Sequence, residues 1–189
     1  MDAYKNTLFE KTGYASINLG LEFKISQYIQ PELNIRYFLG SLPDSNVFDN
    51  ENRIKQSLIR IVNAKNLSFC PKFLLNNNED SIMFQIIPSY NITNVVANGT
   101  LFKINNTNTG LNEVDSDEFK ETIHSIGIGI GIIIDLDEDS LQSLALNLHY
   151  NNIEIGNALS NLKLDTRKYS TRQNIGFGMK YYFSFRKKK

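Results

Sequence analysis

The stretch from Gln173 to Phe185 reads Gln-Asn-Ile-Gly-Phe-Gly-Met-Lys-Tyr-Tyr-Phe-Ser-Phe, and it decides the fold. Large apolar side chains occupy every second position from Ile175 to Phe185, and most of the intervening positions carry glycine or a polar residue. A period of two is typical of a β-strand whose faces meet different environments. An apolar face, a small or polar face and an aromatic end together indicate a strand of a transmembrane barrel.

The same alternation recurs along the chain, which has 189 residues and no Pro/Gly/Ser-rich linker. It predicts one domain, residues 1–189, built from antiparallel strands. The segment Arg53–Val62 fits both a helical and a strand period, and we interpret it as a strand that runs into Leu67. The other predicted strands are Tyr14–Ile25, Ile29–Leu39, Leu67–Leu75, Ile82–Ile92 with an irregular continuation to Ile104, Ile126–Ile134, Leu144–Tyr150 and the terminal strand.

The connections between these strands have two lengths. Short ones are expected at Ser26–Tyr28, Asn76–Ser81 and Asp135–Ser140, and long polar ones at Gly40–Asn52, Asn105–Glu118 and Asn151–Tyr169. Outer-membrane barrels have short periplasmic turns, long extracellular loops and an even number of strands. Seven strands are clear, so we expect about eight in the full-length form. The opening strand is then upstream of Met1 or a degenerate piece within Ala3–Glu10, and residues 1–12 are an N-terminal extension or loop.

The position of the glycines indicates which face points outward. Six of them lie on the polar faces of the strands: Gly20, Gly127, Gly129, Gly131, Gly176 and Gly178. Glycine weakens a strand and needs a reason such as the close approach of other groups, which a crowded lumen supplies. The apolar faces also carry more volume than an eight-stranded interior holds. We therefore expect an all-β, antiparallel up-and-down transmembrane barrel with lipid outside; a soluble lipid-binding barrel is the opposite arrangement.

The polar faces predict a charged lumen, because buried charges need partners. We expect Arg36 to reach Glu22 or Glu32, and we expect the paired charges to close the lumen to a wide aqueous channel. Cys70 is expected to be a small residue that faces the lumen. The predicted lumen cluster consists of Glu22, Lys24, Glu32, Arg36, Lys72, Asn147, His149 and Lys180.

Composition excludes several other functions. The formal net charge is zero, which argues against nucleic acid as the main partner. A single cysteine excludes a disulfide framework and a multi-thiolate metal site. The acidic turn Asp135–Ser140 lacks the glycine and the final carboxylate of a calcium loop, so we predict neither a metal nor a cofactor. The two histidines, His124 and His149, have no surrounding pattern that predicts a catalytic site.

The chain resembles small Bacteroidota-type outer-membrane β-barrel proteins, the outer membrane protein beta-barrel domain or porin-family grouping. The resemblance rests on Gly20–Ile25, Pro31–Tyr37 and Gly176–Phe185. The last segment is similar to the signal that the barrel-assembly machinery reads, with Gly178, Tyr181, Phe183 and Phe185 at the expected positions. Residues 186–189, Arg-Lys-Lys-Lys, form a basic tail beyond it. The resemblance implies the bacterial outer membrane as location, its lipids and lipopolysaccharide as surroundings, and no particular reaction.

We therefore expect a structural or interaction protein, not an enzyme, which meets an unknown extracellular ligand through its loops. The first alternative is a small-solute porin. The second is a lipid-modifying enzyme, such as a hydrolase or acyltransferase, embedded in the barrel.

Overall fold

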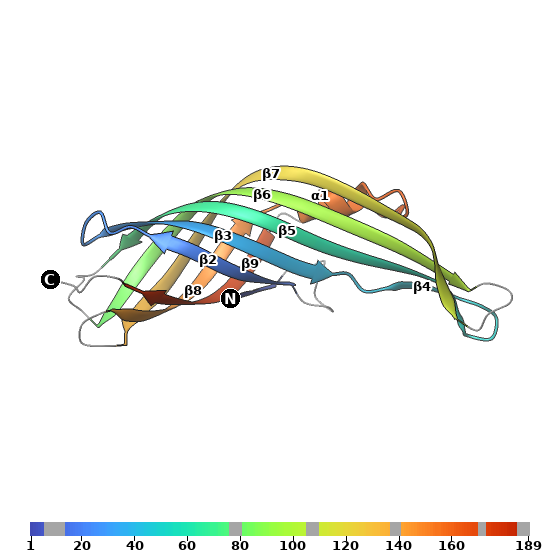
Figure 1. Cartoon of the computed structure of the whole chain (residues 1–189), viewed down its shortest axis with the longest axis horizontal. Coiled ribbons are helices and arrows are strands. Elements are labelled where there is room, and N and C mark those ends of the chain that lie inside the picture. The colour runs from blue at the N-terminus through green and yellow to red at the C-terminus, as the bar shows by residue number, and fades with distance from the viewer. Residues whose placement is uncertain (6–13, 76–80, 105–109, 137–140, 170–172, 185–189) are drawn as a thin grey trace.

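The computed structural model is almost entirely β-sheet (Figure 1). It describes residues 1–5, 14–75, 81–104, 110–136, 141–169 and 173–184. The strands and the one helix of these residues are β1 Asp2–Lys5, β2 Tyr14–Glu22, β3 Ile29–Ser41, β4 Ser45–Phe48, β5 Ile54–Leu74, β6 Ile82–Ile104, β7 Leu111–Asp135, β8 Gln142–Asn152, α1 Ile155–Ser160 and β9 Gln173–Phe183.

Eight of the strands form a closed ring in the order β1, β2, β3, β5, β6, β7, β8, β9. Every neighbouring pair is antiparallel, and β1 closes the ring by pairing with both β2 and β9. The strand β1 overlaps the degenerate piece expected within Ala3–Glu10. Arg53–Val62 is strand, as predicted, because it forms the first half of β5. Where all eight strands pair around the ring, the sheet has no free edge.

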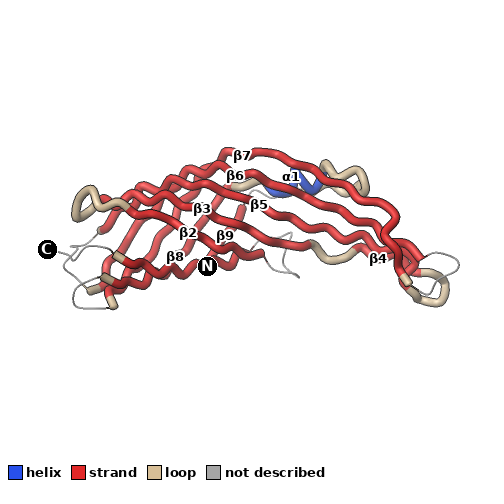
Figure 2. The backbone as a smooth tube through the Cα atoms, viewed as in Figure 1, coloured by secondary structure: helices blue, strands red, loops and turns tan. Residues whose placement is uncertain are grey.

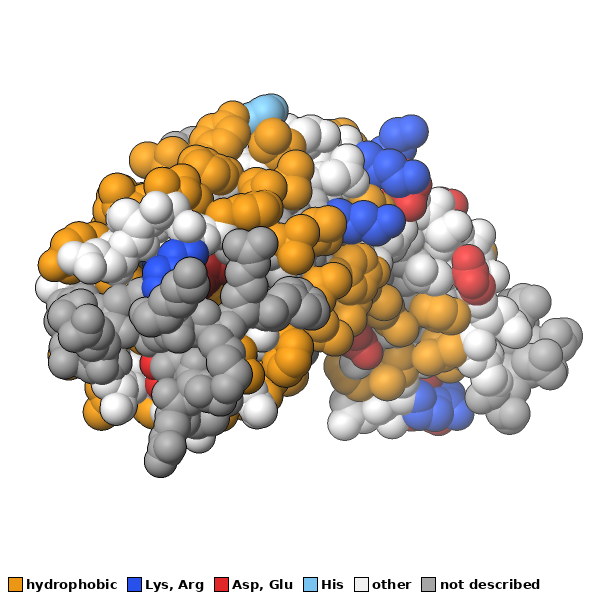
Figure 3. Space-filling model, turned by 60° about the vertical axis from the view of Figure 1, so that its left-hand side comes forward, with side chains coloured by type: hydrophobic (Ala, Val, Ile, Leu, Met, Phe, Trp, Pro, Cys, Tyr) orange, Lys and Arg blue, Asp and Glu red, His pale blue; other side chains and the backbone are white. Residues whose placement is uncertain are grey.

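The apolar faces of the strands point outward and the polar faces inward. On β3, the side chains of Leu33, Ile35 and Leu39 are exposed, whereas Glu32 and Arg36 are buried. Ile128, Ile130 and Phe177 are likewise more than half exposed. Figure 3 shows hydrophobic side chains covering a broad area of the barrel. The orientation predicted from the glycines is therefore the one that the structure has.

The outward apolar side chains form a belt of limited height. On β6 the belt runs from Ile82 to Ile92, and these ten residue steps rise about 34 Å along the strand. For a strand tilted by ~40° from the barrel axis, this corresponds to a height of about 26 Å along the axis. A polar outward row lies directly above it: Lys65 pairs with Asn94, and Asn94 pairs with Thr122. A transmembrane barrel has an apolar band ~25 Å tall, which this belt matches.

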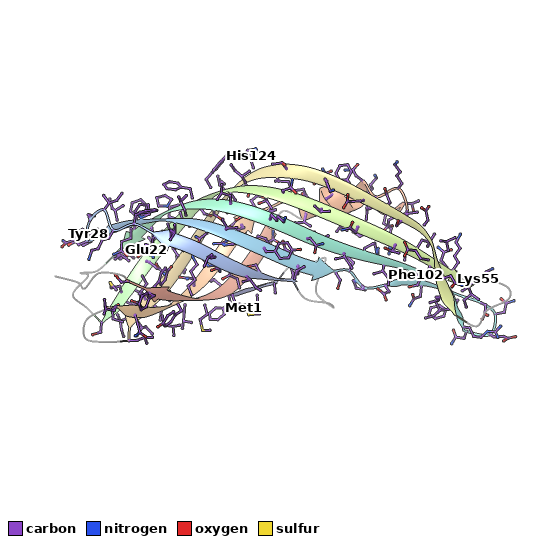
Figure 4. The ribbon with its side chains drawn as sticks, in the orientation of Figure 1. Met1, Glu22, Tyr28, Lys55, Phe102 and His124 are labelled. Atoms are coloured by element: carbon purple, nitrogen blue, oxygen red, sulfur yellow. The ribbon has the colours of Figure 1, made fainter. Side chains whose placement is uncertain are left out.

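Three strands continue far beyond the belt. β5, β6 and β7 have 21, 23 and 25 residues, and together with β4 they form a sheet that protrudes from one end of the barrel (Figures 1 and 2). Two expected loops are therefore partly strand. β7 begins at Leu111, within the predicted loop Asn105–Glu118, and β4 lies within the predicted loop Gly40–Asn52. Figure 4 places Lys55 and Phe102 at this end and Tyr28 and Glu22 at the short-turn end.

The connection between β8 and β9 turns inward. Its residues 153–169, called the strap below, include α1 and pack on the inner face of the protruding sheet. Ile155, Ala158 and Leu159 are fully buried there against Val62 and Val95, so the predicted polar loop Asn151–Tyr169 is largely a packed element. Among the described residues, no helix is long and apolar enough to cross a membrane.

Candidate functional site

Glycines in the lumen make room for amides on the neighbouring strands. In the ladder between β7 and β8, Gly131 is opposite Asn147 and Gly127 is opposite Asn151. A Cβ atom on Gly131 would lie 2.1 Å from Asn147 Oδ1 and 2.5 Å from the backbone oxygen of Leu146. These glycines are therefore required by the close approach of polar groups, which is the reason expected from their place on the polar face.

His149 occupies the middle of the lumen between two glycines, Gly129 on β7 and Gly176 on β9. The side chain is buried, and a Cβ on Gly129 would lie 2.7 Å from His149 Nδ1. Ser143, near in sequence and a possible nucleophile, instead donates a hydrogen bond to Asp135 at the short-turn end. His149 is thus a buried residue of the lumen, and the Ser143 hydroxyl forms its hydrogen bond with Asp135 and not with the His149 imidazole.

Charged residues cluster in the half of the lumen near the short turns. Lys180 Nζ lies 2.7 Å from Glu32 Oε1, and Tyr182 donates to Glu32 Oε2 at 3.1 Å. Lys72 forms an ion pair with Glu22, lies 4.0 Å from the second oxygen of Glu32, and stands 4.4 Å from the centre of the Tyr182 ring. Two carboxylates and two ammonium groups therefore balance each other in this half.

One expectation about the lumen cluster needs correction. Lys24 lies beyond the end of β2 and is exposed, because this strand stops at Glu22 and not at Ile25. Lys72 and Lys180 supply ion pairs to Glu22 and Glu32, and the expected contact of Arg36 with one of these carboxylates stays a prediction. Glu22 itself keeps a quarter of its side chain exposed. The other predicted members, Glu32, Arg36, Lys72, Asn147, His149 and Lys180, are all buried.

Several lumen residues were absent from the predicted cluster. Asn66 donates to Thr93 at 2.8 Å, and Gln85 donates to the Oδ1 atom of Asn147 at 2.6 Å. Asp2 on β1 accepts hydrogen bonds from Ser16 and Asn18. Each of these residues except Asp2 lies on the polar face of an alternating strand, so the alternation that located the cluster could also have found them. Cys70 is buried and faces the lumen, as expected, where Asn34 Nδ2 lies 3.6 Å from its sulfur.

Apolar clusters lie at both ends of this polar interior. At the short-turn end Leu74, Met83, Ile133 and Ala145 pack together with Tyr182 beside them. At the other end the stacked rings of Tyr14 and Phe38, 5.5 Å apart, join the buried residues of the strap. Buried side chains are therefore described at both ends of the lumen and between them.

An ion-pair cluster fastens the strap to the protruding sheet. The buried carboxylate of Asp165 accepts hydrogen bonds from Arg60 Nη1 at 2.8 Å, Tyr169 OH at 2.7 Å and Arg167 Nε at 2.9 Å. The side chains of Arg60 and Asp165 are only 2% and 3% exposed. Arg60 also donates to the backbone oxygen of Pro43. Sequence alone could not find this cluster, because Arg60 and Asp165 are 105 residues apart.

Electrostatics favour the ionised form of this carboxyl. Burial raises the pKa of Asp165, but hydrogen bonds from Arg167, Tyr169 and Arg60 outweigh burial and hold the pKa below its usual value. Burial and the hydrogen bond to Asp165 raise the pKa of the Tyr169 hydroxyl. The cluster therefore keeps one carboxylate, one neutral phenol and two guanidinium groups at neutral pH.

The terminal strand places three of the four expected signal residues. Gly178 is buried and faces the lumen, where a Cβ would lie 2.0 Å from Asp2 Oδ1. Tyr181 and Phe183 point outward and are 58% and 60% exposed. Phe185 and the basic tail 186–189 lie outside the described residues, as do the predicted turn at 76–80 and most of the acidic turn.

This geometry defines a class: an antiparallel, eight-stranded barrel-like protein with an apolar exterior and a packed polar interior. Comparison with known proteins gives nothing closer, since no protein-family model matches the chain and no curated protein matches it.

Proposed function

We propose that this chain is a bacterial outer-membrane β-barrel protein with a closed, charge-paired lumen that acts through its protruding sheet. The observation that carries the proposal is the outward apolar belt around a ring whose interior is polar. Exposed aliphatic side chains over ~26 Å of height, bounded above by the row of Lys65, Asn94 and Thr122, suit hydrocarbon and not water.

The arrangement also supports a structural or interaction role over transport. A porin needs an aqueous passage, whereas here apolar clusters lie at both ends of the lumen and the ion pairs Lys180–Glu32 and Lys72–Glu22 lie between them. A lipid-modifying enzyme needs a nucleophile and a base that converge at one rim. Its best candidate base, His149, is buried between Gly129 on β7 and Gly176 on β9.

Insertion is tested by refolding the purified chain into phospholipid vesicles. We expect a band on unboiled gels that shifts on heating, and protection of the strands that carry the apolar belt from added protease. Refolding into a soluble, detergent-free monomer would refute the membrane proposal and favour the soluble lipid-binding barrel.

Closure is tested by recording conductance in planar bilayers from the same preparation. We expect no steady open channels. Steady channels in the wild-type protein would establish the porin alternative. Phospholipid and lipid A turnover, compared between the wild type and His149→Ala, tests the enzyme alternative; turnover that disappears in the variant would overturn the non-enzymatic proposal.

The terminal strand supports the outer membrane as the proposed location in the cell. We propose that Gly178, Tyr181, Phe183 and Phe185 are read by the barrel-assembly machinery, with outer-membrane lipids and lipopolysaccharide around the belt. Replacing Tyr181 and Phe183 together by serine is expected to leave unassembled chain in the periplasm. Normal assembly of this double variant would remove these positions from the signal.

A further inference from the structure

The strand β7 has an edge that its neighbour β8 does not cover. β8 pairs with β7 only from Gly127 to Asp135, because β8 ends at Asn152 and the chain then turns inward to the strap. β7 continues to Leu111 with β6 on its other side. In Figure 1 this part of β7 forms the margin of the protruding sheet, with α1 beneath it. The edge Leu111–Ile126, named the β7 edge below, lies above the apolar belt except for its last three residues, His124–Ile126, which pair with Ile92–Tyr90 of the belt.

The strap approaches the β7 edge through side chains and leaves its backbone free to pair. Asn157 donates to Glu121 Oε2 at 2.7 Å, and the backbone nitrogen of Lys163 donates to Asp117 Oδ2 at 2.5 Å. Within the described residues, the backbone hydrogen bonds of this stretch are those of the ladder with β6 and one in which the backbone nitrogen of Ser116 donates to Asp115 Oδ1 at 2.9 Å. A row of main-chain donors and acceptors on a sheet edge is a template for another strand.

A pocket opens at the base of the β7 edge, with a volume of about 550 Å³. Glu121, Thr122 and His124 line it from β7, and Glu154 and Asn157 line it from the strap. Figure 4 shows His124 on the outer side of β7 near the middle of the molecule. Glu121 Oε1 is buried and has no hydrogen-bond partner among the described residues. A buried carboxylate oxygen of this kind is stabilised by a charged donor.

Charge decides which occupant suits the edge. Leu111–Ile126 contains five carboxylates and one lysine: Glu113, Asp115, Asp117, Glu118, Glu121 and Lys120. A second copy paired edge to edge would place these carboxylates beside one another, and like charges opposite each other destabilise a strand pair. An extended segment that carries lysine or arginine would instead meet complementary charge along the edge and in the pocket.

We propose that the β7 edge binds an extended, basic segment of a partner protein as an added strand, with one lysine or arginine side chain in the pocket beside Glu121. This proposal deepens the interaction role given above and rests on it. Main-chain pairing with the edge supplies affinity, and the pocket supplies the preference for a cationic side chain.

The test uses the full chain refolded in vesicles and a labelled, end-capped octapeptide of alternating lysine and valine as the probe. Fluorescence anisotropy is expected to show saturable binding, and an octapeptide of alternating glutamate and valine is expected not to bind. Glu121→Lys and Glu121→Gln are expected to weaken binding by tenfold or more and about threefold, respectively. Glu118→Lys is the matched control: it makes the same charge change on the outward face, where Glu118 pairs with the exposed Lys120, and should change affinity less than twofold.

Two N-methylated peptides separate strand addition from plain electrostatic attraction. One carries N-methyl groups on the lysines and the other on the valines, so each lacks the main-chain donors of one edge only. We expect one of the two to lose binding and the other to keep it. Equal binding by both, or equal weakening by Glu118→Lys and Glu121→Lys, would reduce the contact to charge alone and overturn the proposal.

Failure of this proposal and failure of the membrane proposal give different results. Every variant is first checked for the heat-dependent gel shift, so that loss of binding is not confused with loss of the barrel. A barrel that inserts normally but binds no lysine peptide refutes the edge site alone. A chain that does not insert refutes the proposed function on which the site rests.

Discussion

Removal of the Asp165 carboxylate should release the strap from the protruding sheet. In Asp165→Asn the Arg60 guanidinium, 2% exposed, loses its charged partner. Breaking a buried pair by removing one partner costs about 3–5 kcal/mol. If that cost falls on strap docking, the undocked population rises by roughly a hundredfold to a few thousandfold, since about 1.4 kcal/mol corresponds to a factor of ten.

Amide hydrogen exchange of α1, followed by mass spectrometry of the protein in vesicles, measures this population directly. Exchange in Ile155–Ser160 should accelerate by the same factor, while exchange in the barrel strands stays unchanged. Asp49→Asn is the matched control, because it breaks an ion pair with Arg53 whose side chain is 67% exposed. An exposed pair contributes about 0–1 kcal/mol, so α1 should exchange at the wild-type rate.

If the buried ion pair holds the strap in place, a second substitution should restore the protection of α1 from exchange, and this protection should depend on pH. Arg60→Met combined with Asp165→Asn removes both charges and should recover much of the lost protection. Because docking lowers the pKa of Asp165, its contribution is complete above the unfolded value near ~3.9 and is lost as the pH falls towards the docked value. Protection should thus be constant between about pH 5 and 8 and fall below about pH 4. No change in Asp165→Asn, or equal changes in the control, would refute the reasoning.

Three further substitutions test the barrel itself, each by urea unfolding of the vesicle-inserted protein. Gly131→Ala should cost about 1–3 kcal/mol, because its Cβ meets backbone as well as Asn147, whereas Gly110→Ala, with open space around it, should cost under ~1 kcal/mol. Ile130→Lys places a charge in the middle of the belt and should cost about 2–4 kcal/mol in vesicles; a cost near zero would show that this face meets water. Lys180→Met leaves Glu32 without its nearest ammonium group and should cost about 3 kcal/mol or more, and a cost no larger than that of exposed Lys120→Met would contradict a dry lumen.

The barrel could be predicted from sequence because its two faces differ in chemistry. Ile128 and Ile130 are large apolar residues on the outer face, Gly129 makes room for His149 on the inner face, and this contrast repeats every second residue. The degenerate β1 was harder, since only four residues of it pair. Its place in the ring follows from the even strand count and not from its own pattern.

The β7 part of the protruding sheet escaped prediction for a physical reason, whereas the parts in β5 and β6 were predicted as strand. Above the belt both faces of β7 are hydrophilic or mixed: Lys120 and Thr122 point one way, and Asp117 and Glu121 the other. Without an apolar face, alternation carries no hydrophobic signal, and the stretch reads as a polar loop. The strap cluster gave no signal either, because the contact between Arg60 and Asp165 depends on tertiary structure alone.

The pairing of small with amide residues across β7, β8 and β9 restricts how this sequence can change over time. A Cβ on Gly131 would meet Asn147 Oδ1, and a Cβ on Gly178 would meet Asp2 Oδ1, so neither glycine can gain a methyl group by itself. A tolerated exchange must therefore be compensated by a smaller side chain at the residue that the new methyl group meets. In a collection of variants selected for assembly, Gly131 should covary with Asn147 and Gly178 with Asp2, whereas outward Ile130 should vary freely among apolar side chains.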